Sequence, residues 1–562
     1  MSLYEDLKER IYHGLAVAAE QARAAGALNF ERLPAYVLEE PREKQHGDLA
    51  TNLAMVLAKQ ARRSPREIAA ALIQSLDAAS LGVTETEIAG AGFINFRLDP
   101  QWLNGVIPEV LRQGAEYGSV DIGHGEKVQL EFVSANPTGL LHMGNARGAA
   151  LGDSLASLLT MAGYNVSREF YINDAGNQIV NFGLSLEARY LQKFGVEAEF
   201  PEAGYHGEDL IDTVERMIAQ EGDKYLTMEA ELRREFLVRY ALNEKIREMR
   251  ETLAEFGVTY DVWFSEQSLH DSGAVRQVME EMDRLGYIYE KDGALWLRST
   301  QMGDDKDEVV VRGNGTPTYF AADIAYHRDK FARGFQRVIN IWGADHHGHV
   351  ARMQGAMQVL GHDPESVQII LMQFVRLIQD GEVVKMSKRS GRYVTLRDLL
   401  GEVGKDAARF FFLLRDPGST VDFDLDLAKE QSSENPVYYV QYAYARLCSI
   451  LRQAEKEFPR DLTDAVDPRD LAQLASAEER QLLKKLADLP GEIAIAAQLR
   501  EPHRLARFVL DLAALFHTFY NGHRVLVEDE AIRKARLALI RATRQVLLNV
   551  LRILGVGAPE KM

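Results

Sequence analysis

The chain has 562 residues, 46% hydrophobic and 26% charged, which is typical of a soluble globular protein with about three or four domains. Its single cysteine, Cys448, excludes a disulfide framework and fits a reducing cytosol, and no stretch reaches the roughly 18 apolar residues of a membrane span. The net charge of −18, taken alone, argues against a nucleic-acid partner. We expect a cytoplasmic monomer that has no membrane partner.

Residues 1–118 are predicted to form a separate α/β module. Helical periodicity runs over residues 4–24 and 65–76, and residues 91–98 alternate between apolar and polar side chains as a strand does. The stretch 113–126 is rich in glycine and acid and is the predicted linker to the next domain.

Residues 119–430 alternate between predicted strands and helices. A strand over 128–133 is followed by a helix over 146–161 and a strand over 165–172, with later strands at 338–342 and 367–373. This alternation predicts a parallel sheet with crossover helices. The charged helical stretch 184–282 is interpreted as an insertion.

The first strand ends in a turn at residues 136–139, and His142-Met-Gly144-Asn145 then opens the following helix. At a strand-to-helix junction Gly144 lets a nucleotide approach the backbone, and His142 can donate to phosphate oxygens at the helix N-terminus. The alternative is a histidine whose hydrogen bonds are satisfied within the turn. The position at the junction favours phosphate binding.

A second motif, Lys385-Met386-Ser387-Lys388, is predicted to be a cationic loop. Lysines are hydrated point charges that can close over a triphosphate, although the tetrapeptide alone also fits a solvated turn. Together with His142 in one α/β domain, the motif predicts charge stabilisation during nucleotidyl transfer.

Two further clusters follow predicted turns or strands. Gly343-Ala-Asp345-His-His-Gly-His349 comes just after the strand 338–342, where a carboxylate suits a ribose hydroxyl; a structural role and a metal site remain alternatives. Tyr319 and Asp323 lie one helical turn apart. If they converge with Glu131, the three would suit a planar guanidinium; a Tyr–Asp hydrogen bond in the core is the alternative.

Residues 431–562 are predicted to be all-helical, with helices over 438–456, 475–489, 501–521 and 531–554. This part carries 19 Lys and Arg against 17 Asp and Glu, a net of +2, so the rest of the chain carries −20. Within 531–552, five basic residues share about a third of the helix circumference, and no acid is present. They are Arg533, Lys534, Arg541, Arg544 and Arg552, with Arg536 off this stripe. The stripe predicts contact with a phosphate backbone, and a solvated helix face is the alternative.

On these motifs the chain resembles bacterial-type arginyl-tRNA synthetases, which are class I aminoacyl-tRNA synthetases, over essentially its full length. Family-specific matches are Glu131-x-x-Ser134-x-Asn136-Pro137 before His142, the run Tyr171-Ile-Asn-Asp-Ala-Gly-Asn-Gln178, and Tyr319-x-x-x-Asp323. The resemblance implies an α/β multidomain protein with a Rossmann-type catalytic domain over 119–430. An N-terminal module over 1–118 would touch the tRNA elbow, and a DALR-type anticodon-binding domain would cover 431–562. The letters DALR are absent, and Pro502–Phe508 fills that region.

The family implies ATP-dependent ligation of L-arginine to tRNA(Arg) through an arginyl-adenylate, with Mg²⁺, releasing AMP and pyrophosphate. The implied arginine-binding residues are Glu131, Ser134, Asn136, Tyr319 and Asp323. The implied ATP-binding residues are His142, Gly144, Asn145, Gly343, Asp345, His349, Met386, Ser387 and Lys388, and catalysis is assigned to His142, Asn145, Lys385 and Lys388. The tRNA-binding residues are Tyr439, Tyr442, Tyr520 and Met562 by resemblance, with Arg541 and Arg544 from the basic stripe. No bound metal is expected in the chain itself.

Two other hypotheses fit parts of the pattern. One is a related ligase that uses an aminoacyl-adenylate without tRNA, which the basic helical domain disfavours. The other is a catalytically inactive relative that only binds RNA, which the intact His142, Lys388 and Asp323 disfavour.

Overall fold

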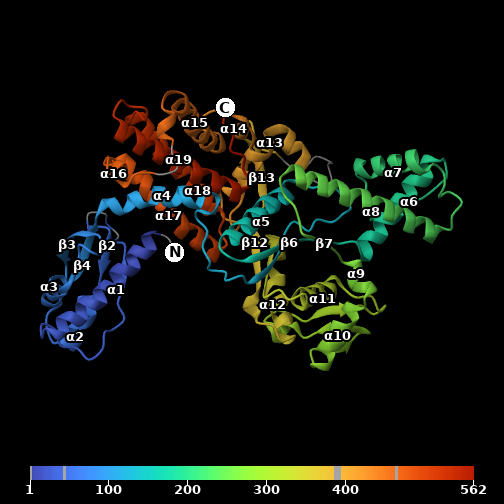
Figure 1. Cartoon of the computed structure of the whole chain (residues 1–562). Coiled ribbons are helices and arrows are strands. Elements are labelled where there is room, and N and C mark those ends of the chain that lie inside the picture. Colours follow the sequence, from blue (N-terminus) through green and yellow to red (C-terminus); the bar gives the residue numbers. More distant parts are fainter. Residues whose placement is uncertain (1–2, 42, 44–45, 385–393, 463–465) are drawn as a thin grey trace.

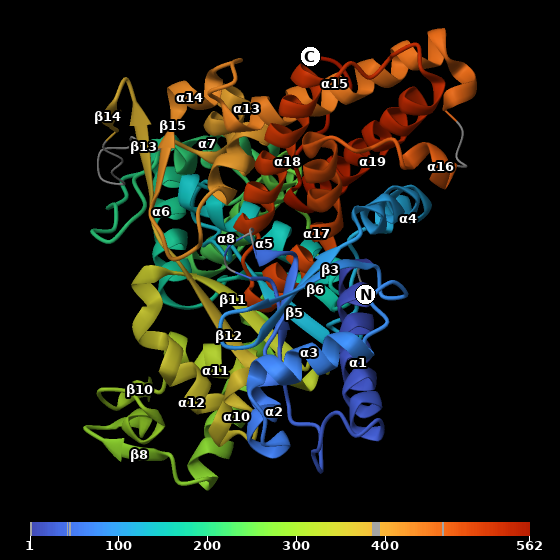
Figure 2. The ribbon, with the colours of Figure 1, turned by 90° about the vertical axis from the view of Figure 1, so that its left-hand side faces the viewer.

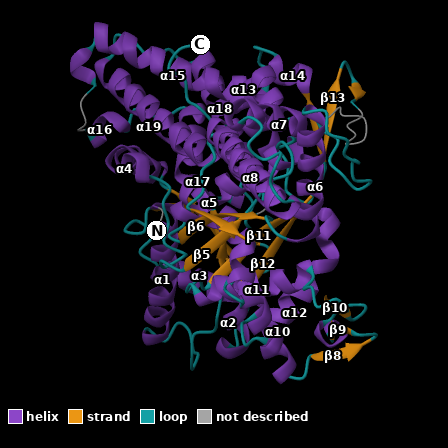
Figure 3. Ribbon diagram, turned by 90° about the vertical axis from the view of Figure 1, so that its right-hand side faces the viewer, coloured by secondary structure: helices purple, strands orange, loops and turns teal. Residues whose placement is uncertain are grey.

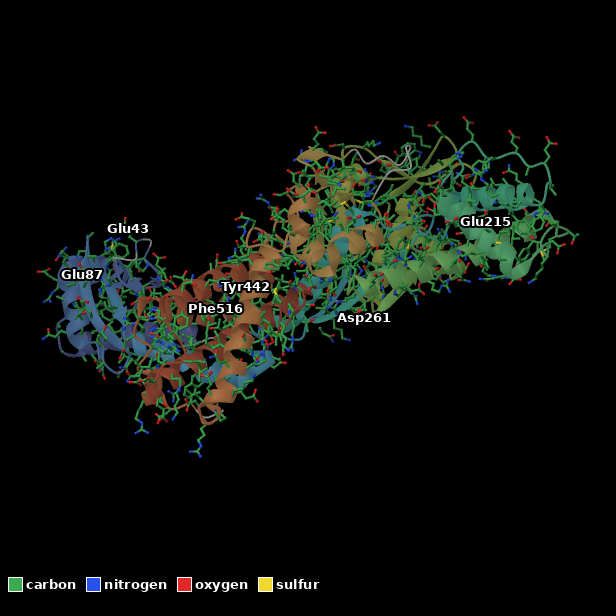
Figure 4. All side chains as sticks on the ribbon, turned by 90° about the horizontal axis from the view of Figure 1, so that it is seen from above. Glu43, Glu87, Glu215, Asp261, Tyr442 and Phe516 are labelled. Atoms are coloured by element: carbon green, nitrogen blue, oxygen red, sulfur yellow. The ribbon has the colours of Figure 1, made fainter. Side chains whose placement is uncertain are left out.

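The computed structural model of the chain describes residues 3–41, 43, 46–384, 394–462 and 466–562. The molecule is elongated, with the N-terminal module at one end and the helices α6 and α7 at the other (Figures 1 and 4). In Figure 4, Glu43 and Glu87 mark the first end and Glu215 marks the second. Within the described ranges, no helix combines the length and apolar character needed to cross a membrane.

The N-terminal module packs three helices against an antiparallel sheet of strand order β1-β2-β4-β3. Its elements are α1 (Leu3–Ala24), β1 (Leu38–Glu39), β2 (Leu49–Thr51), α2 (Leu53–Ala61), α3 (Pro65–Ser75), β3 (Val83–Ala89) and β4 (Phe93–Leu98). Helix α3 begins at a capping box, in which Ser64 and Glu67 each accept a backbone N–H of the other. Helix α4 (Val106–Gln113) leads from this module into the central domain.

The central domain is built on a five-stranded, all-parallel sheet of order β12-β11-β5-β6-β7, which confirms the predicted parallel sheet. The strands are β5 (Lys127–Glu131), β6 (Asn165–Ile172), β7 (Val262–Ser265), β11 (Arg337–Gly343) and β12 (Val367–Met372). Helices α5 (Met143–Met161) and α8 (Ala230–Glu255) lie on one side of the sheet, and α11 (Tyr319–Ala332) and α12 (Val350–Val359) lie on the other (Figure 3). Helix α5 packs closely on the end of β5. A Cβ added at Gly152 would lie only 2.1 Å from the ring of Phe132, which directly follows the strand, so a larger side chain would not fit there.

The prediction of one helical insertion over 184–282 is wrong in its C-terminal part. Helices α6 (Gly176–Lys193), α7 (Glu208–Glu221) and α8 do form a protruding helical body. Residues Val262–Ser265, however, form strand β7, which pairs in parallel with β6 and completes the sheet. Four residues are too few to show strand periodicity in a sequence. Helices α9 (Gln267–Asp271) and α10 (Ala274–Arg284) follow β7.

Two small sheets were not predicted. One is antiparallel and consists of β8 (Ile288–Lys291), β9 (Ala294–Leu297) and β10 (Glu308–Val311). The other consists of β13 (Val375–Gln379), β14 (Glu382–Val383) and β15 (Val421–Asp424), in the order β14-β13-β15. The lysine motif follows β14, and Lys385, Met386, Ser387 and Lys388 lie outside the described residues.

After residue 434 the described residues form helices and no strand, as predicted. The helices from residue 396 onward are α13 (Leu396–Leu413), α14 (Leu425–Lys429), α15 (Pro436–Glu457), α16 (Pro468–Leu471), α17 (Ala477–Leu499), α18 (His503–Gly522) and α19 (Glu530–Leu554). Helix α19 packs along α15 and ends at Gly555, which has a left-handed φ of 65° (Figure 2).

The buried Arg409 of α13 joins the end of α19 to α5. Its Nε donates to the Leu554 carbonyl at 2.9 Å, and its Nη2 donates to Asp153 of α5 at 2.6 Å. Ser154 of α5 also donates to the Leu554 carbonyl, at 3.3 Å. The helical domain is therefore fixed to the same helix that begins at His142.

Candidate active site

Glu131 ends the central strand β5, and its buried carboxylate is held on both oxygens. The fully buried Lys330 of α11 donates to its Oε2 at 2.7 Å and to Asn340 Oδ1 at 2.8 Å. The Ser134 hydroxyl donates to Glu131 Oε1 at 2.8 Å and accepts the Tyr171 backbone N–H at 3.2 Å.

The chain reaches this geometry through an unusual turn after β5. Val133 and Ser134 have φ values of 73° and 41°, in the left-handed region that costs a non-glycine residue about 1–3 kcal/mol. This turn brings the Ser134 hydroxyl back onto Glu131. Asn136 follows on the exposed side of the same turn. Strain of this kind is retained where surrounding structure or function requires it.

Three carboxylates gather beside this strand end. Burial, with Glu131 and Glu266 nearby, raises the pKa of Asp323 to about 8. Burial also raises the pKa of Glu266, whose carboxylate interacts with the Tyr171 hydroxyl and lies 3.7 Å from His270 Nε2. Among the described residues Asp323 has no ion-pair partner, and Lys330 is the lysine paired within the group. A desolvated cluster with this excess of negative charge is complementary to a cationic ligand.

The segment that follows strand β6 adds neutral acceptors. Asn173 Oδ1 and Gln178 Oε1 are buried and have no hydrogen-bond partner among the described residues. Tyr319, which is 39% exposed, lies over Gly176, where a Cβ would come within 3.6 Å of the phenol oxygen. Acceptors in excess of donors suit a ligand with several N–H groups, such as a guanidinium. The structure therefore brings Glu131, Ser134, Tyr319 and Asp323 into one region.

The N-terminus of α5 forms a second part of the site. His142 is the N-cap: its Nδ1 accepts the Gly144 N–H at 3.1 Å, and Asn145 Oδ1 accepts the His142 N–H at 3.0 Å. Thr395 pairs with His142 as an isolated antiparallel bridge. Thr395, seven residues after Lys388, therefore lies beside this helix N-terminus, where backbone dipoles favour the binding of phosphate.

Gly343 and Asp345 lie at the carboxyl end of the neighbouring strand β11. Gly343 is the N-cap of a short 3-10 helix, η5 (Ala344–His349), and Asp345 is exposed in the first turn of that helix. Burial and the adjacent Arg352 lower the pKa of His349. Within the described ranges, no three His, Cys, Asp or Glu side chains are placed so that they could hold a metal ion. An exposed carboxylate at this edge of the sheet suits a ribose hydroxyl.

The predicted tRNA-contacting tyrosines lie on α15 and α18, and Tyr442 is labelled in Figure 4. Arg446, which the sequence analysis missed, donates to the Tyr442 hydroxyl and, at 3.2 Å, to the Tyr520 hydroxyl. Its guanidinium carbon is 5.1 Å from the centroid of each ring. Its spacing of four residues from Tyr442 on a predicted helix was the available signal. Tyr439 packs on His517, with ring centroids 4.8 Å apart, and Met562 is 53% exposed.

The predicted basic stripe is wrong at its N-terminal end. Arg533 is buried, pairs with Asp461 at 2.6 Å and covers the Phe458 ring at 4.0 Å. Lys534 pairs with Glu530. Helical spacing identifies residues that share a face, but it does not say whether other elements cover that face.

Comparisons with known proteins agree on one family. Residues 106–413 match the model for the catalytic domain of class I tRNA synthetases of the arginine type. Residues 8–98 match the arginyl-tRNA synthetase N-terminal domain, and residues 440–562 match the DALR anticodon binding domain.

Similar proteins cover the whole chain. An arginine–tRNA ligase of Desulfitobacterium hafniense is 70% identical over 562 residues, covering 100% of both chains. One from Moorella thermoacetica is 61% identical, again over 100% of both chains. The structure of Thermus thermophilus arginyl-tRNA synthetase has the same fold, with a TM-score of 0.73 at 24% identity, covering 99% of this chain and 100% of its own.

Proposed function

The chain belongs to the arginyl-tRNA synthetase family, and we propose how its side chains carry out the ATP-dependent attachment of L-arginine to tRNA(Arg). The observation that supports the assignment of arginine most directly is the carboxylate group of Glu131, Asp323 and Glu266. In the free protein, protonation of Asp323 relieves their mutual repulsion; a bound cation relieves it while the carboxylates stay ionised. Among amino acids the guanidinium of arginine matches a planar set of acceptors.

Asp323 is the carboxylate that contacts the guanidinium in this proposal. It has no ion-pair partner among the described residues, whereas both oxygens of Glu131 already accept from Ser134 and Lys330. Glu131 contributes charge and its remaining lone pairs, and Tyr319 covers the ligand from the exposed side. Ser134 and Asn136 hold the α-amino group, which leaves the arginine carboxylate facing the N-terminus of α5.

ATP is placed with its triphosphate at that N-terminus, on His142, Gly144 and Asn145. The capping hydrogen bonds fix the His142 ring, so the imidazole is already oriented before the nucleotide arrives. The ribose lies toward Gly343, Asp345 and His349. Lys385, Met386, Ser387 and Lys388, which lie outside the described residues, close over the phosphates. Mg²⁺ enters as the ATP complex, because it keeps several waters and binds through substrate phosphates.

The reaction has two displacement steps. The arginine carboxylate attacks the α-phosphorus of ATP, the bond to the β-phosphate oxygen breaks, and pyrophosphate leaves. A terminal ribose hydroxyl of tRNA then attacks the acyl carbon of the arginyl-adenylate, forming the ester and releasing AMP. No side-chain nucleophile is required, so the protein contributes positioning and charge stabilisation by His142, Asn145, Lys385 and Lys388.

The tRNA extends from this site over the helical domain. We assign anticodon contacts to Tyr439, Tyr442, Tyr520 and Met562, because aromatic faces suit unstacked bases. Tyr442 and Met562 are exposed, and Tyr439 and Tyr520 are half-buried. Arg541 and Arg544 of α19 contact the phosphate backbone. The N-terminal module contacts the tRNA elbow.

The test is arginine charging by the purified chain, with citrulline as the competing substrate. Citrulline carries a neutral ureido group in place of the guanidinium, so it leaves the carboxylates unpaired and should be rejected by a factor of roughly 10⁴ in kcat/KM. Pyrophosphate exchange, run with and without tRNA, separates this enzyme from a tRNA-independent ligase. Binding of tRNA without any charging would show an inactive RNA-binding relative and would end the proposal.

A further inference from the structure

A chain of buried hydrogen bonds connects Glu131 with Asp323. Lys330 of α11 donates from Nζ to Glu131 Oε2 at 2.7 Å and to Oδ1 of Asn340, on β11, at 2.8 Å. Asn340 Nδ2 lies 2.7 Å from His327 Nε2, and His327 Nδ1 lies 2.8 Å from the backbone carbonyl oxygen of Asp323. The side chains that form the middle of this chain are buried, because Lys330, Asn340 and His327 are each at most 2% exposed.

The direction of each hydrogen bond in this chain follows from Lys330. An ammonium group can only donate, so the amide oxygen of Asn340 faces Lys330 and its amide nitrogen faces His327. His327 then accepts at Nε2 and carries its proton on Nδ1, from which it donates to the Asp323 carbonyl. Burial and the charge of Lys330 hold the pKa of His327 well below its ordinary value, so the ring is neutral in this arrangement. One ammonium group therefore fixes both the amide orientation and the histidine tautomer.

The neighbouring strand shows that Lys330 is the cation of Glu131 alone. Glu169 on β6 is the register partner of Glu131, and its two oxygens accept from Arg333 of α11 at 2.6 and 2.8 Å. Lys330 Nζ lies 4.2 Å from the centroid of the Tyr326 ring, whose hydroxyl donates to Glu169. Because Arg333 is occupied by Glu169, loss of Lys330 would leave Glu131 without an ion-pair partner among the described residues.

Lys330 also affects the charge of Asp323. The titratable groups around Asp323 are Glu131 of β5, Tyr171 of β6, Glu266 after β7, and His327 and Lys330 of α11. Burial, Glu131 and Glu266 raise the pKa of Asp323, and Lys330 lowers it. Since His327 is neutral, the ammonium is the cation in this group. The ionised fraction of Asp323 near neutral pH therefore depends on Lys330.

We propose that Lys330 is a positioning residue for arginine recognition, which holds Glu131 directly, and Asp323 through Asn340 and His327, in the orientation that accepts the guanidinium. The proposal rests on the function proposed above. Lys330 itself is fully buried and its Nζ contacts protein groups, so it acts through the two carboxylate residues and not on the substrate. A site that is oriented before its ligand arrives binds that ligand at lower cost, so loss of Lys330 should appear in the KM for arginine.

The test compares Lys330→Met with Lys245→Met. Lys245 of α8 is the matched control, because it is 1% exposed and pairs with Asp209 at 2.8 Å in the protruding helical body. Each variant deprives a carboxylate of its lysine, so both should unfold at a lower temperature than the native chain. In tRNA-dependent pyrophosphate exchange at pH 7.5, Lys330→Met should raise the arginine KM about tenfold or more, with the ATP KM and the kcat near their native values. Lys245→Met should keep the native arginine KM. Because KM does not depend on how much of the enzyme is folded, lower stability alone cannot produce this difference.

The pH profile is a readout that a purely structural role would not change. The kcat/KM for arginine should rise with pH in the native chain as Asp323 ionises. Lys330→Met lacks the group that lowers the pKa of Asp323, so its rise should be displaced to higher pH and its deficit should shrink at pH 9.5. Lys245→Met should keep the native profile. A folded Lys330→Met with the native arginine KM and the native pH profile would overturn the proposal.

Asn340→Leu tests the same chain without leaving a charge unpaired, so it does not depend on whether Lys330→Met folds. The side chain keeps a similar size, and Lys330 keeps Glu131, but the connection to His327 and Asp323 is lost. The arginine KM should rise about fivefold, with the ATP KM unchanged. A native arginine KM in Asn340→Leu would show that the hydrogen-bond chain does not position the site, and the proposal would be wrong. Absence of arginine charging by the native chain would instead refute the proposed function, so the two failures are distinguishable.

Discussion

Replacing Asp323 by Asn removes one charge from the carboxylate group while keeping the size of the side chain. If Asp323 holds the guanidinium, the variant loses a charge-assisted hydrogen bond in a desolvated site. Such a bond contributes about 2–4 kcal/mol, so kcat/KM for arginine should fall roughly a hundredfold at pH 8. The KM for ATP should change little, because the nucleotide is bound at α5 and β11.

The pH dependence follows from the raised pKa. With a pKa of about 8 in the free enzyme, Asp323 is ionised in about one molecule in ten at pH 7 and in about nine of ten at pH 9. Only the ionised form pairs with the guanidinium. The kcat/KM for arginine should therefore rise about tenfold between pH 7 and pH 9 in the native chain, and this rise should be absent from Asp323→Asn.

The same substitution should stabilise the free protein. Because the pKa of Asp323 is higher in the folded chain than its ordinary 3.8, the folded state keeps a proton that the unfolded chain has lost. The free energy of unfolding therefore falls as pH rises from about 4 to about 8 and levels off above that range. The two pKa values allow at most about 6 kcal/mol, and relaxation of the half-buried site reduces the expected gain of Asp323→Asn to about 1–3 kcal/mol at pH 8.

The measurements are tRNA-dependent pyrophosphate exchange and the first thermal unfolding transition, each at pH 7, pH 8.5 and pH 9. Asp283→Asn is the matched control, because Asp283 is exposed on α10, away from the carboxylate group. The reasoning is refuted if Asp323→Asn leaves the arginine KM unchanged, or if it is less stable than the native chain at pH 8.5.

Three other variants probe the N-terminus of α5, the tyrosines of the helical domain, and the contact between α5 and α19. His142→Ala should lower kcat for pyrophosphate exchange by about 10²–10³-fold without raising the arginine KM; a purely structural cap would instead lower the melting temperature and spare kcat. Arg446→Ala releases the hydroxyl of Tyr442 and should raise the KM for tRNA about tenfold in charging assays, with the arginine KM unchanged. Arg409→Met removes the nearer cation from the buried Asp153, which keeps Arg168 at 3.5 Å, and should destabilise the chain by about 3–5 kcal/mol in thermal unfolding. A melting temperature equal to the native value would remove Arg409 from the contact between α5 and α19.

Local patterns predicted the central fold because each pattern spans a whole element. The strand β6 and the helix α5 are each long enough to be recognised in the sequence, and the order of strands and helices is enough to predict a parallel sheet. Strand β7 was not predicted, because it has only four residues and its position depends on pairing with β6 rather than on its own sequence. The two small sheets were not predicted, for the same reason.

The sequence motifs predicted the candidate site, but they did not predict the residues that contact the motif side chains in the folded chain. Lys330 lies seven residues after Asp323 on α11, so the two share a helix face. This spacing becomes meaningful only when β5 is known to bring Glu131 to the same place. Glu266 is a clearer case, because nothing local indicates that the chain after β7 returns to the carboxyl end of β6. These residues come together through tertiary contacts that a sequence pattern does not encode.

The net charge of −18 does not conflict with an RNA partner, because the charges that matter are local. The helical domain over 431–562 carries a net of +2 and the rest of the chain carries −20. Within the ranges described, the carboxylate of Asp323 has no ion-pair partner in the central domain. This arrangement lowers stability in the free protein and is relieved by a ligand of the opposite charge, the guanidinium of arginine. Asp323→Asn therefore tests the arginine site and the stability cost of the buried carboxylate together.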